Sequence, residues 1–270
     1  MHNLSPSRIF FLLFAAAVSL AGCATVHPNK LSTIPNCLEQ NRQVTYRLDI
    51  EMIEKQATEV PLWMQLDAKP REASGHGSGT IIHESGYILT SAHVVKEKGW
   101  KGKVTITVAV RGQPQAVTLE GTVMAIDTKK DLAVVQVNQR FPFAGTIAQP
   151  GELQDGEAVY NVGYPFDFGE MIGRGHVMRQ DYVPSGDMSE RGTTLLLDIS
   201  DGSGTSGSAI LSENTGKIVG VMMAYTFRRD GPDMPPMVVR VAVPVEKIRS
   251  FLDENGIPYH SSPPGTPVCE

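Results

Sequence analysis

The sequence predicts an all-β fold, and three features of its pattern support that prediction. Many short runs rich in Val, Ile and Thr are separated by Gly, Asp, Asn and Pro. β-branched residues favour strands, and the separating residues favour turns. The runs follow one another without intervening helices, and only one segment has a clear helical pattern. This spacing is typical of a β-sandwich or a pair of β-barrels and does not fit alternating β–α–β units.

Length and composition place the chain among ordinary globular proteins. Its 270 residues suffice for one two-barrel domain or two small domains. Hydrophobic residues make up 41% and charged residues 20% of the chain, which are common values. The formal net charge is −5, and neither sign forms a long run. Since nucleic-acid binding depends on clustered Lys and Arg, we expect no nucleic-acid partner.

The first 22 residues are predicted to be a signal peptide, which is cleaved off and is not part of the mature fold. Arg8 provides a positive start, and Ile9–Leu20 is apolar but shorter than the ~20 residues of a membrane span. The run ends at Leu20–Cys23, which resembles the lipobox of bacterial lipoproteins. The alternative is an ordinary secretory signal followed by a chance cysteine. We therefore expect an exported protein, lipidated at Cys23, anchored to a membrane of the bacterial envelope and facing the periplasm.

Residues 23–45 are predicted to form a lipidated tether, because prolines and asparagines interrupt them and few apolar positions are periodic. Apart from Cys23, the chain has two cysteines, Cys37 and Cys269. An even pair in an oxidising compartment is a disulfide candidate. Two unpaired thiols on the terminal segments are the alternative.

The predicted strands begin with a hairpin, in which Gly79–Ile82 and Tyr87–Thr90 flank the turn residues 84–86. The later strands are Lys103–Val110, Gly121–Ile126, Leu132–Val137, Ala158–Val162, Thr194–Leu197, Ser208–Leu211, Ile218–Tyr225 and Val238–Val243.

The one predicted helix runs from about Val245 to Asn255. Ile248, Phe251 and Leu252 share one face, and Gly256 can end the helix in the left-handed conformation. The final residues, 259–270, contain several prolines and are predicted to be an irregular tail.

A glycine-rich turn offers a candidate nucleophile. In Gly202–Ser208, two glycines flank Ser206, and glycine adopts backbone angles that other residues resist. In such a turn the amides of Gly204 and Ser206 can point to the same side and bind a developing oxyanion. Taken alone, the segment also fits a Gly/Ser hairpin loop, with Ser203 and Ser208 as rival nucleophiles.

A base and an acid for this serine are available elsewhere in the chain. His93 directly follows the Tyr87–Thr90 strand, whereas the other histidines lie in the signal, in terminal segments or in less distinctive contexts. Asp131 opens the apolar run Leu132–Val137, where an unpaired charge is costly. Asp127 is its rival, in a more loop-like context. Serine acyl transfer needs such a base and such a carboxylate.

Four segments together carry a family resemblance. Gly77–Val95 resembles the His region of the HtrA (Deg) trypsin-like proteases, and Asp131–Val134 resembles their Asp motif. Gly204–Ala209 is similar to their nucleophile loop, and Gly163–Phe166 is similar to the Gly-Asn/Tyr-Pro-Phe turn of the family. The order His, Asp, Ser is also that of the chymotrypsin arrangement.

The resemblance implies two antiparallel six-stranded β-barrels, residues 46–142 and 143–258, the second including the C-terminal helix. It implies a serine endopeptidase with the triad His93, Asp131 and Ser206, acting on polypeptides in envelope quality control or processing. We expect neither cofactor nor metal, since no paired histidines or Cys/His cluster is visible. The alternatives are a catalytically silent binding or chaperone lipoprotein on this fold, and an esterase.

The sequence also departs from the family pattern. Thr205 and Ser208 replace the usual Asn or Asp and the second Gly of the nucleophile loop. A PDZ domain, usual in the family, is not expected after the helix. The implied substrate pocket consists of Ser200, Asp201, Met222, Met223 and Ala224. Asp201 could select a basic P1 residue if it points inward, whereas the methionines favour a small apolar one.

Overall fold

The computed structural model describes residues 33–54, 72–95, 100–108, 117–166, 168–228 and 237–268. The predicted signal peptide, Cys23 and Cys269 lie outside these residues. Within the described segments, no helix is both long and apolar enough to cross a membrane.

The N-terminal half of the fold is a closed, six-stranded antiparallel barrel in the order β1-β2-β3-β6-β5-β4. Its strands are β1 (Thr45–Glu54), β2 (Glu72–His83), β3 (Tyr87–Thr90), β4 (Trp100–Val108), β5 (Val117–Asp127) and β6 (Leu132–Val137). β2 and β3 form the predicted hairpin, and β6 has the predicted bounds. Leu48, Ile81, Ile88 and Val135 are among the residues that fill the barrel.

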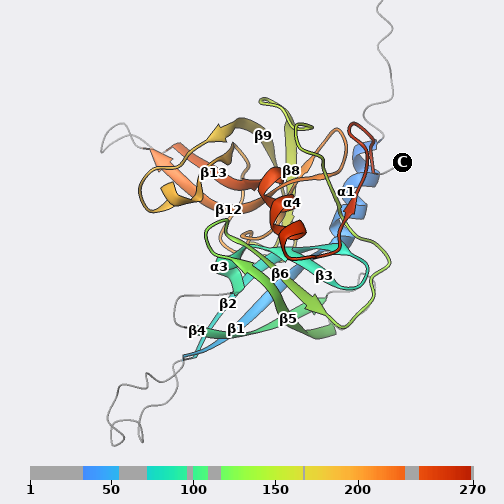
Figure 1. Ribbon diagram of the computed structural model, residues 1–270, viewed down its shortest axis with the longest axis vertical. Coiled ribbons are helices and arrows are strands. Elements are labelled where there is room, and N and C mark those ends of the chain that lie inside the picture. The colour runs from blue at the N-terminus through green and yellow to red at the C-terminus, as the bar shows by residue number, and fades with distance from the viewer. Residues whose placement is uncertain are drawn as a thin grey trace, which may run out of the picture.

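The C-terminal half is a sheet of eight strands in the order β11-β8-β9-β10-β13-β12-β7-β14. Because β11 also pairs with β12, the first and the sixth strand of this order are hydrogen-bonded to each other, and these six strands form a closed ring. The strands are β7 (Thr146–Ile147), β8 (Ala158–Gly163), β9 (Met171–Tyr182), β10 (Thr194–Leu197), β11 (Ala209–Ser212), β12 (Ile218–Arg228), β13 (Met237–Pro244) and β14 (His260–Ser261). Figure 1 shows this half, lime to red, above the blue-to-green first barrel. The predicted fold class, a double β-barrel with a C-terminal helix, is confirmed.

The C-terminal helix α4 (Val245–Glu254) has the predicted position and face. Ile248, Phe251 and Leu252 are buried in the core of the second barrel. Gly256 has a φ of 62°, in the left-handed region, and the Ile257 amide donates to the Leu252 carbonyl at 3.0 Å. The helix therefore ends where its sequence predicts, with its last carbonyls satisfied.

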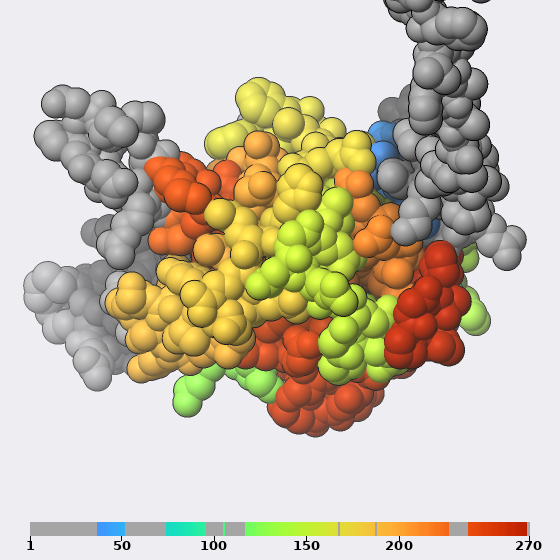
Figure 2. All heavy atoms as spheres, turned by 90° about the horizontal axis from the view of Figure 1, so that it is seen from above, coloured from blue at the N-terminus to red at the C-terminus, as the bar shows by residue number. Residues whose placement is uncertain are grey.

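The residues after α4 are held against the second barrel, as Figure 2 shows for the dark red segment beside the lime one. Lys217 is fully buried, with its ammonium 2.9 Å from Glu152 and 2.7 Å from the Pro263 carbonyl, and the Gly265 amide also donates to Glu152. Burial alone would raise the pKa of Glu152, but the Gln149 amide and Lys217 outweigh it and lower that pKa. The predicted irregular tail is thus fixed by a buried ion pair.

The predicted irregular tether was wrong for residues 33–44, which form helix α1 (Thr33–Val44). Pro35 lies in the first turn, where a missing amide hydrogen costs little. Asn41 is buried and donates to the Tyr160 hydroxyl at 2.9 Å and the Gly216 carbonyl at 3.0 Å. Polar anchoring of this kind leaves no apolar periodicity in the sequence. Cys37 is also buried in this helix and is disulfide-bonded.

Candidate active site

His93 lies on a single helical turn, α3 (Ala92–Val95), directly after β3. Ala92, Val94 and Val95 are buried in the first barrel, whereas the His93 side chain is 43% exposed. The preceding Ser91 is buried and donates its hydroxyl to the Met222 carbonyl of the second barrel at 2.8 Å. The packing of its neighbours therefore presents the imidazole at the junction of the two barrels.

Asp131 contacts His93 directly. Its carboxylate accepts from the His93 amide at 3.0 Å and lies 2.9 Å from the imidazole Nδ1. The carboxylate is 2% exposed and Asp131 has a φ of 59°, so the backbone takes an unusual conformation to present it. An ionised carboxylate can only accept hydrogen bonds, so Nδ1 carries the proton and Nε2 keeps its lone pair.

The rival acid, Asp127, is used differently. Its Oδ1 accepts from the amides of Lys129 and Lys130, both at 2.9 Å, and closes the turn between β5 and β6. This turn is the local structure that Asp side chains commonly form. The structure therefore brings Asp131, and not Asp127, to His93.

The loop around Ser206 is fastened to the first barrel by its backbone. The Ser206 carbonyl accepts from the Ser78 amide at 2.8 Å, and the Ser78 hydroxyl donates to the Gly204 carbonyl at 2.8 Å. Gly207 has a φ of 85°, and a Cβ there would lie 2.1 Å from the Thr90 hydroxyl oxygen. Only glycine fits this approach. Ser206 is thereby held beside the segment that leads from β3 to His93.

The two rival serines occupy different surroundings. Ser208 is fully buried, and its hydroxyl accepts from the Asn161 amide group at 3.1 Å. Ser203 is exposed, and its carbonyl accepts from the Phe166 amide at 2.7 Å. Ser206, between them, is half-buried.

The amides of the same loop divide into two groups. Those of Thr205, Gly207 and Ser208 donate to backbone carbonyls. In the described part of the chain, the amides of Gly204 and Ser206 donate to no backbone group. Gly204 has a φ of 103°, which again requires glycine. The two amides predicted to bind an oxyanion are therefore among the amides of this loop that donate to no described backbone carbonyl.

Asp201 neither faces an open pocket as a free charge nor lies exposed on the loop. Its side chain is 4% exposed and forms an ion pair with Arg240, whose guanidinium also donates to the Asp201 carbonyl at 2.6 Å. The Thr205 hydroxyl donates to the Asp201 carboxylate at 2.8 Å. Burial raises the pKa of Asp201, while Thr205 and Arg240 oppose the rise. Thr205, which stands where the family usually has Asn or Asp, thus forms a hydrogen bond that holds the Asp201 carboxylate.

The other residues of the predicted pocket differ in exposure. Met222 and Met223 are buried in the core, Ala224 is half-buried and Ser200 is exposed. Met223 lies at a register shift between β12 and β13.

Two residues near the site were not singled out from the sequence. Arg191, at the end of the 3-10 helix η1 (Gly186–Arg191), places Nη1 3.5 Å from Asp131. The His76 ring packs against Gly204, and its buried Nε2 has no hydrogen-bond partner among the described residues. Both contacts join segments distant in sequence, so local pattern gives no signal for them.

Comparisons with known proteins identify the family of this chain. The model of the trypsin-like peptidase domain matches residues 77–221, which include His93, Asp131 and Ser206. A protein of Synechocystis sp. described as serine protease HhoB is 33% identical over 164 residues, 60% of this chain and 37% of that protein. A protein of Pseudomonas fulva described as a DegP-like periplasmic serine endoprotease is 25% identical over 255 residues, 89% of this chain and 49% of its own length. This chain therefore matches less than half the length of each relative.

A solved structure supports the fold. It is an HtrA-type protease, AlgW, in a variant form with a decapeptide, and it aligns with a TM-score of 0.63 at 19% identity. The alignment covers 83% of this chain and 68% of that one.

Proposed function

Because this chain belongs to the trypsin-like peptidase family, alongside proteases of the HtrA type, we propose that it is a serine endopeptidase with Ser206, His93 and Asp131 as its triad. The observation that carries the proposal is the His93–Asp131 pair beside the fastened Ser206 loop. A nucleophile, a base and a carboxylate are the three parts that serine acyl transfer needs, and these contacts support the proposal that Ser206, His93 and Asp131 supply them.

In the proposed mechanism, the Ser206 hydroxyl attacks the peptide carbonyl while His93 Nε2 takes its proton. Asp131 holds the proton on Nδ1 and stabilises the imidazolium that forms. The amides of Gly204 and Ser206 hold the oxyanion of the tetrahedral intermediate. His93 then protonates the leaving amine, and a water molecule activated by the same imidazole hydrolyses the acyl-enzyme.

The substrate of this proposal is a polypeptide, since the relatives are described as serine proteases and an endoprotease. Asp201 is already neutralised by Arg240, so it is poorly suited to bind a basic P1 side chain. We therefore assign the pocket a small or apolar P1 preference. An esterase would use the same residues. Comparing the cleavage rates of a peptide and an ester that carry the same P1 residue distinguishes a protease from an esterase.

The test of the nucleophile uses the purified full chain and dye-labelled casein as an unfolded substrate. Ser206→Ala should lower turnover by about 10⁶-fold, the scale of a lost triad serine. Ser208→Ala and Ser203→Ala serve as matched controls with far smaller losses, provided circular dichroism shows a native fold. Equal loss in Ser203→Ala and Ser206→Ala would contradict the assignment. A silent chaperone would suppress casein aggregation without cleaving it.

We further propose that the protein acts in the bacterial envelope, as relatives described as periplasmic do, in quality control or processing. Cys23 would carry the lipid, and Cys23→Ser should abolish palmitate incorporation. Persistent labelling of Cys23→Ser would contradict the lipobox. We divide the chain into the signal 1–22, the lipidated segment 23–45, the barrels 46–142 and 143–258, and the tail 259–270.

The disulfide partner of Cys37 is proposed to be Cys269. The Val268 amide donates to the Thr215 carbonyl at 3.0 Å, and Asn41 of α1 binds the adjacent Gly216. The chain thus approaches α1 one residue before Cys269. A reduction-sensitive peptide containing both cysteines would support the pairing, and quantitative alkylation of both without reduction would exclude it.

A further inference from the structure

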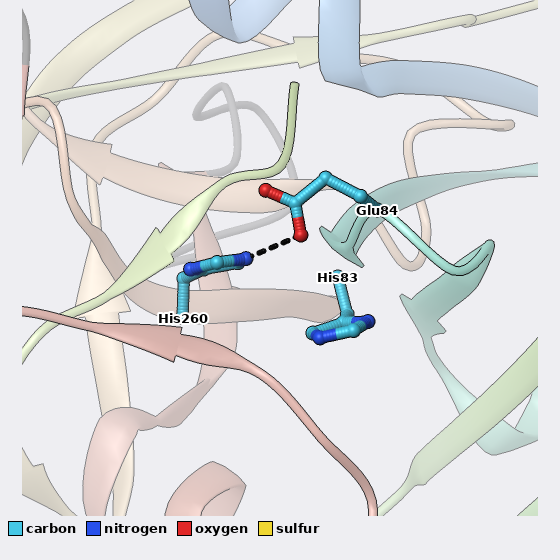
Figure 3. Close-up of side chains that lie close together, drawn as sticks. All are labelled: His83, Glu84 and His260. Atoms are coloured by element: carbon cyan, nitrogen blue, oxygen red, sulfur yellow. Dashed lines mark hydrogen bonds and ion pairs between the residues drawn. The ribbon is translucent and has the colours of Figure 1, made fainter. Parts of the chain in front are cut away.

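Three potential metal ligands meet where the C-terminal segment passes the β2–β3 hairpin of the first barrel. His83 ends β2, Glu84 follows in the hairpin turn, and His260 begins β14 (Figure 3). Their ligand atoms lie within 4.8 Å of one another, and all three residues are half-buried. His260 and Glu84 are 176 positions apart in the sequence, so the cluster exists only in the folded protein.

The backbone fixes both segments that carry these ligands. The Phe141 amide donates to the Glu84 carbonyl at 2.9 Å, and the Gly86 amide to the His83 carbonyl at 3.1 Å. On the other side, His260 pairs with Thr146 of β7. The ligands are therefore held near one another before any ion binds, which lowers the ordering cost of binding.

The three side chains already make hydrogen bonds that an ion would replace. The Ser85 amide lies 3.2 Å from Nδ1 of His83 and donates to it, so Nδ1 holds the lone pair of the ring, and an ion bound there replaces this hydrogen bond. His260 Nε2 lies 2.6 Å from the Glu84 carboxylate. The rings of His83 and His260 stack with centroids 5.4 Å apart.

We propose that His83, Glu84 and His260 form a binding site for one Zn²⁺ ion, with a fourth position open to water. Two imidazoles and a carboxylate are a typical zinc ligand set of the open type. Ligand atoms at zinc distances of 2.0–2.1 Å in tetrahedral geometry lie about 3.4 Å apart. Closing from the present separation takes side-chain rotation, which the 44% and 33% exposure of His260 and Glu84 permits. The ion replaces the His260–Glu84 hydrogen bond and joins the C-terminal segment to the first barrel.

The experiment titrates ZnCl₂ into the chelator-treated full chain, freed of any purification tag, by isothermal calorimetry. Wild type should bind one ion, and Ca²⁺ or Mg²⁺ should not compete, because nitrogen ligands disfavour them. Glu84→Gln and His260→Ala should each weaken binding by at least about 10-fold, the scale on which even outer-shell changes act. His176→Ala is the matched control, since His176 also pairs with a carboxylate, Asp198, at 3.5 Å on the surface.

A second background removes the candidate active site as a competing site. His93→Ala should retain the tight zinc site, and Co²⁺ bound to this variant should show the visible absorption of a four-coordinate ion. Glu84→Gln in the same background should lose that absorption. Zinc affinity unchanged in Glu84→Gln and His260→Ala, or absent in wild type, would overturn the proposal and leave a hydrogen-bonded pair with stacked imidazoles. Because Glu84→Gln keeps the size of the side chain, loss of folding does not confuse this result.

Discussion

Replacing Asp131 by asparagine tests the proposed base–acid pair through a defined change of hydrogen bonds. The carboxylate accepts from both the His93 amide and Nδ1. Asparagine has one acceptor oxygen, and the backbone amide, which can only donate, takes it. The side-chain NH₂ group then faces Nδ1 across about the same distance. Two N–H donors cannot bond to each other, so the imidazole proton moves to Nε2.

An imidazole protonated at Nε2 cannot accept the Ser206 proton. The expected loss is about 10⁴-fold in kcat, the scale of the same change in a known triad. At about 1.4 kcal/mol for each factor of ten, this is about 5.5 kcal/mol of transition-state stabilisation. The fold should survive, since Asn is isosteric with Asp.

Initial rates of casein cleavage measure this loss, with thermal unfolding as the check on folding. Asp127→Asn is the matched control, because its oxygen can still accept from Lys129 and Lys130, and its rate should be nearly unchanged. If Asp127→Asn lost as much activity as Asp131→Asn, or if Asp131→Asn kept wild-type activity, the pairing would have no catalytic role.

Two further substitutions test the packing of the Ser206 loop and the buried ion pair that holds the C-terminal tail. Gly207→Ala should destabilise the fold and remove activity, because its Cβ would collide with the Thr90 hydroxyl. Gly151→Ala is the control: Gly151 also has a positive φ, 80°, but open space around it, so alanine there should cost only the ~1–2 kcal/mol of a left-handed residue. Equal Tm shifts in the two variants would show that the collision at Gly207 has no effect. Lys217→Met should lower the free energy of unfolding by about 3–5 kcal/mol, because it leaves Glu152 buried and unpaired, and Lys217→Met/Glu152→Gln should regain much of that loss. Since the pKa of Glu152 is lowered in the fold, its contribution is present at neutral pH and disappears as the pH falls into the acid range, so a pH-independent difference between wild type and Glu152→Gln would contradict this account.

Strands in which apolar residues alternate with polar ones, or follow one another without interruption, could be predicted from the sequence. β6 and β10 have the predicted bounds, and α4 ends within one residue of its prediction. In contrast, β9 (Met171–Tyr182) carries glycines, charges and many exposed side chains, so it has no clear strand pattern. Its pairing with β8 and β10 defines it instead. Helix α1 was missed for a related reason, since Asn41 anchors it through polar contacts.

The candidate site was predictable where short motifs carry it. His93, Asp131 and Ser206 were named from local sequence, and the structure pairs the first two directly. The state of Asp201 could not be predicted, because its partner Arg240 lies 39 residues away on β13. His83 and His260 similarly gave no sign of a common site, since only the completed fold brings the C-terminal segment to the β2–β3 hairpin.

Covalent labelling with a fluorophosphonate probe tests the central claim most directly. The probe reacts with a serine whose hydroxyl is activated by a neighbouring base, and peptide mapping identifies the residue. The account predicts one adduct, on Ser206, in the folded wild type. It predicts no adduct in Ser206→Ala and greatly slowed labelling in His93→Ala. An adduct on Ser203 or Ser208, or equal labelling of wild type and His93→Ala, would contradict the proposed triad.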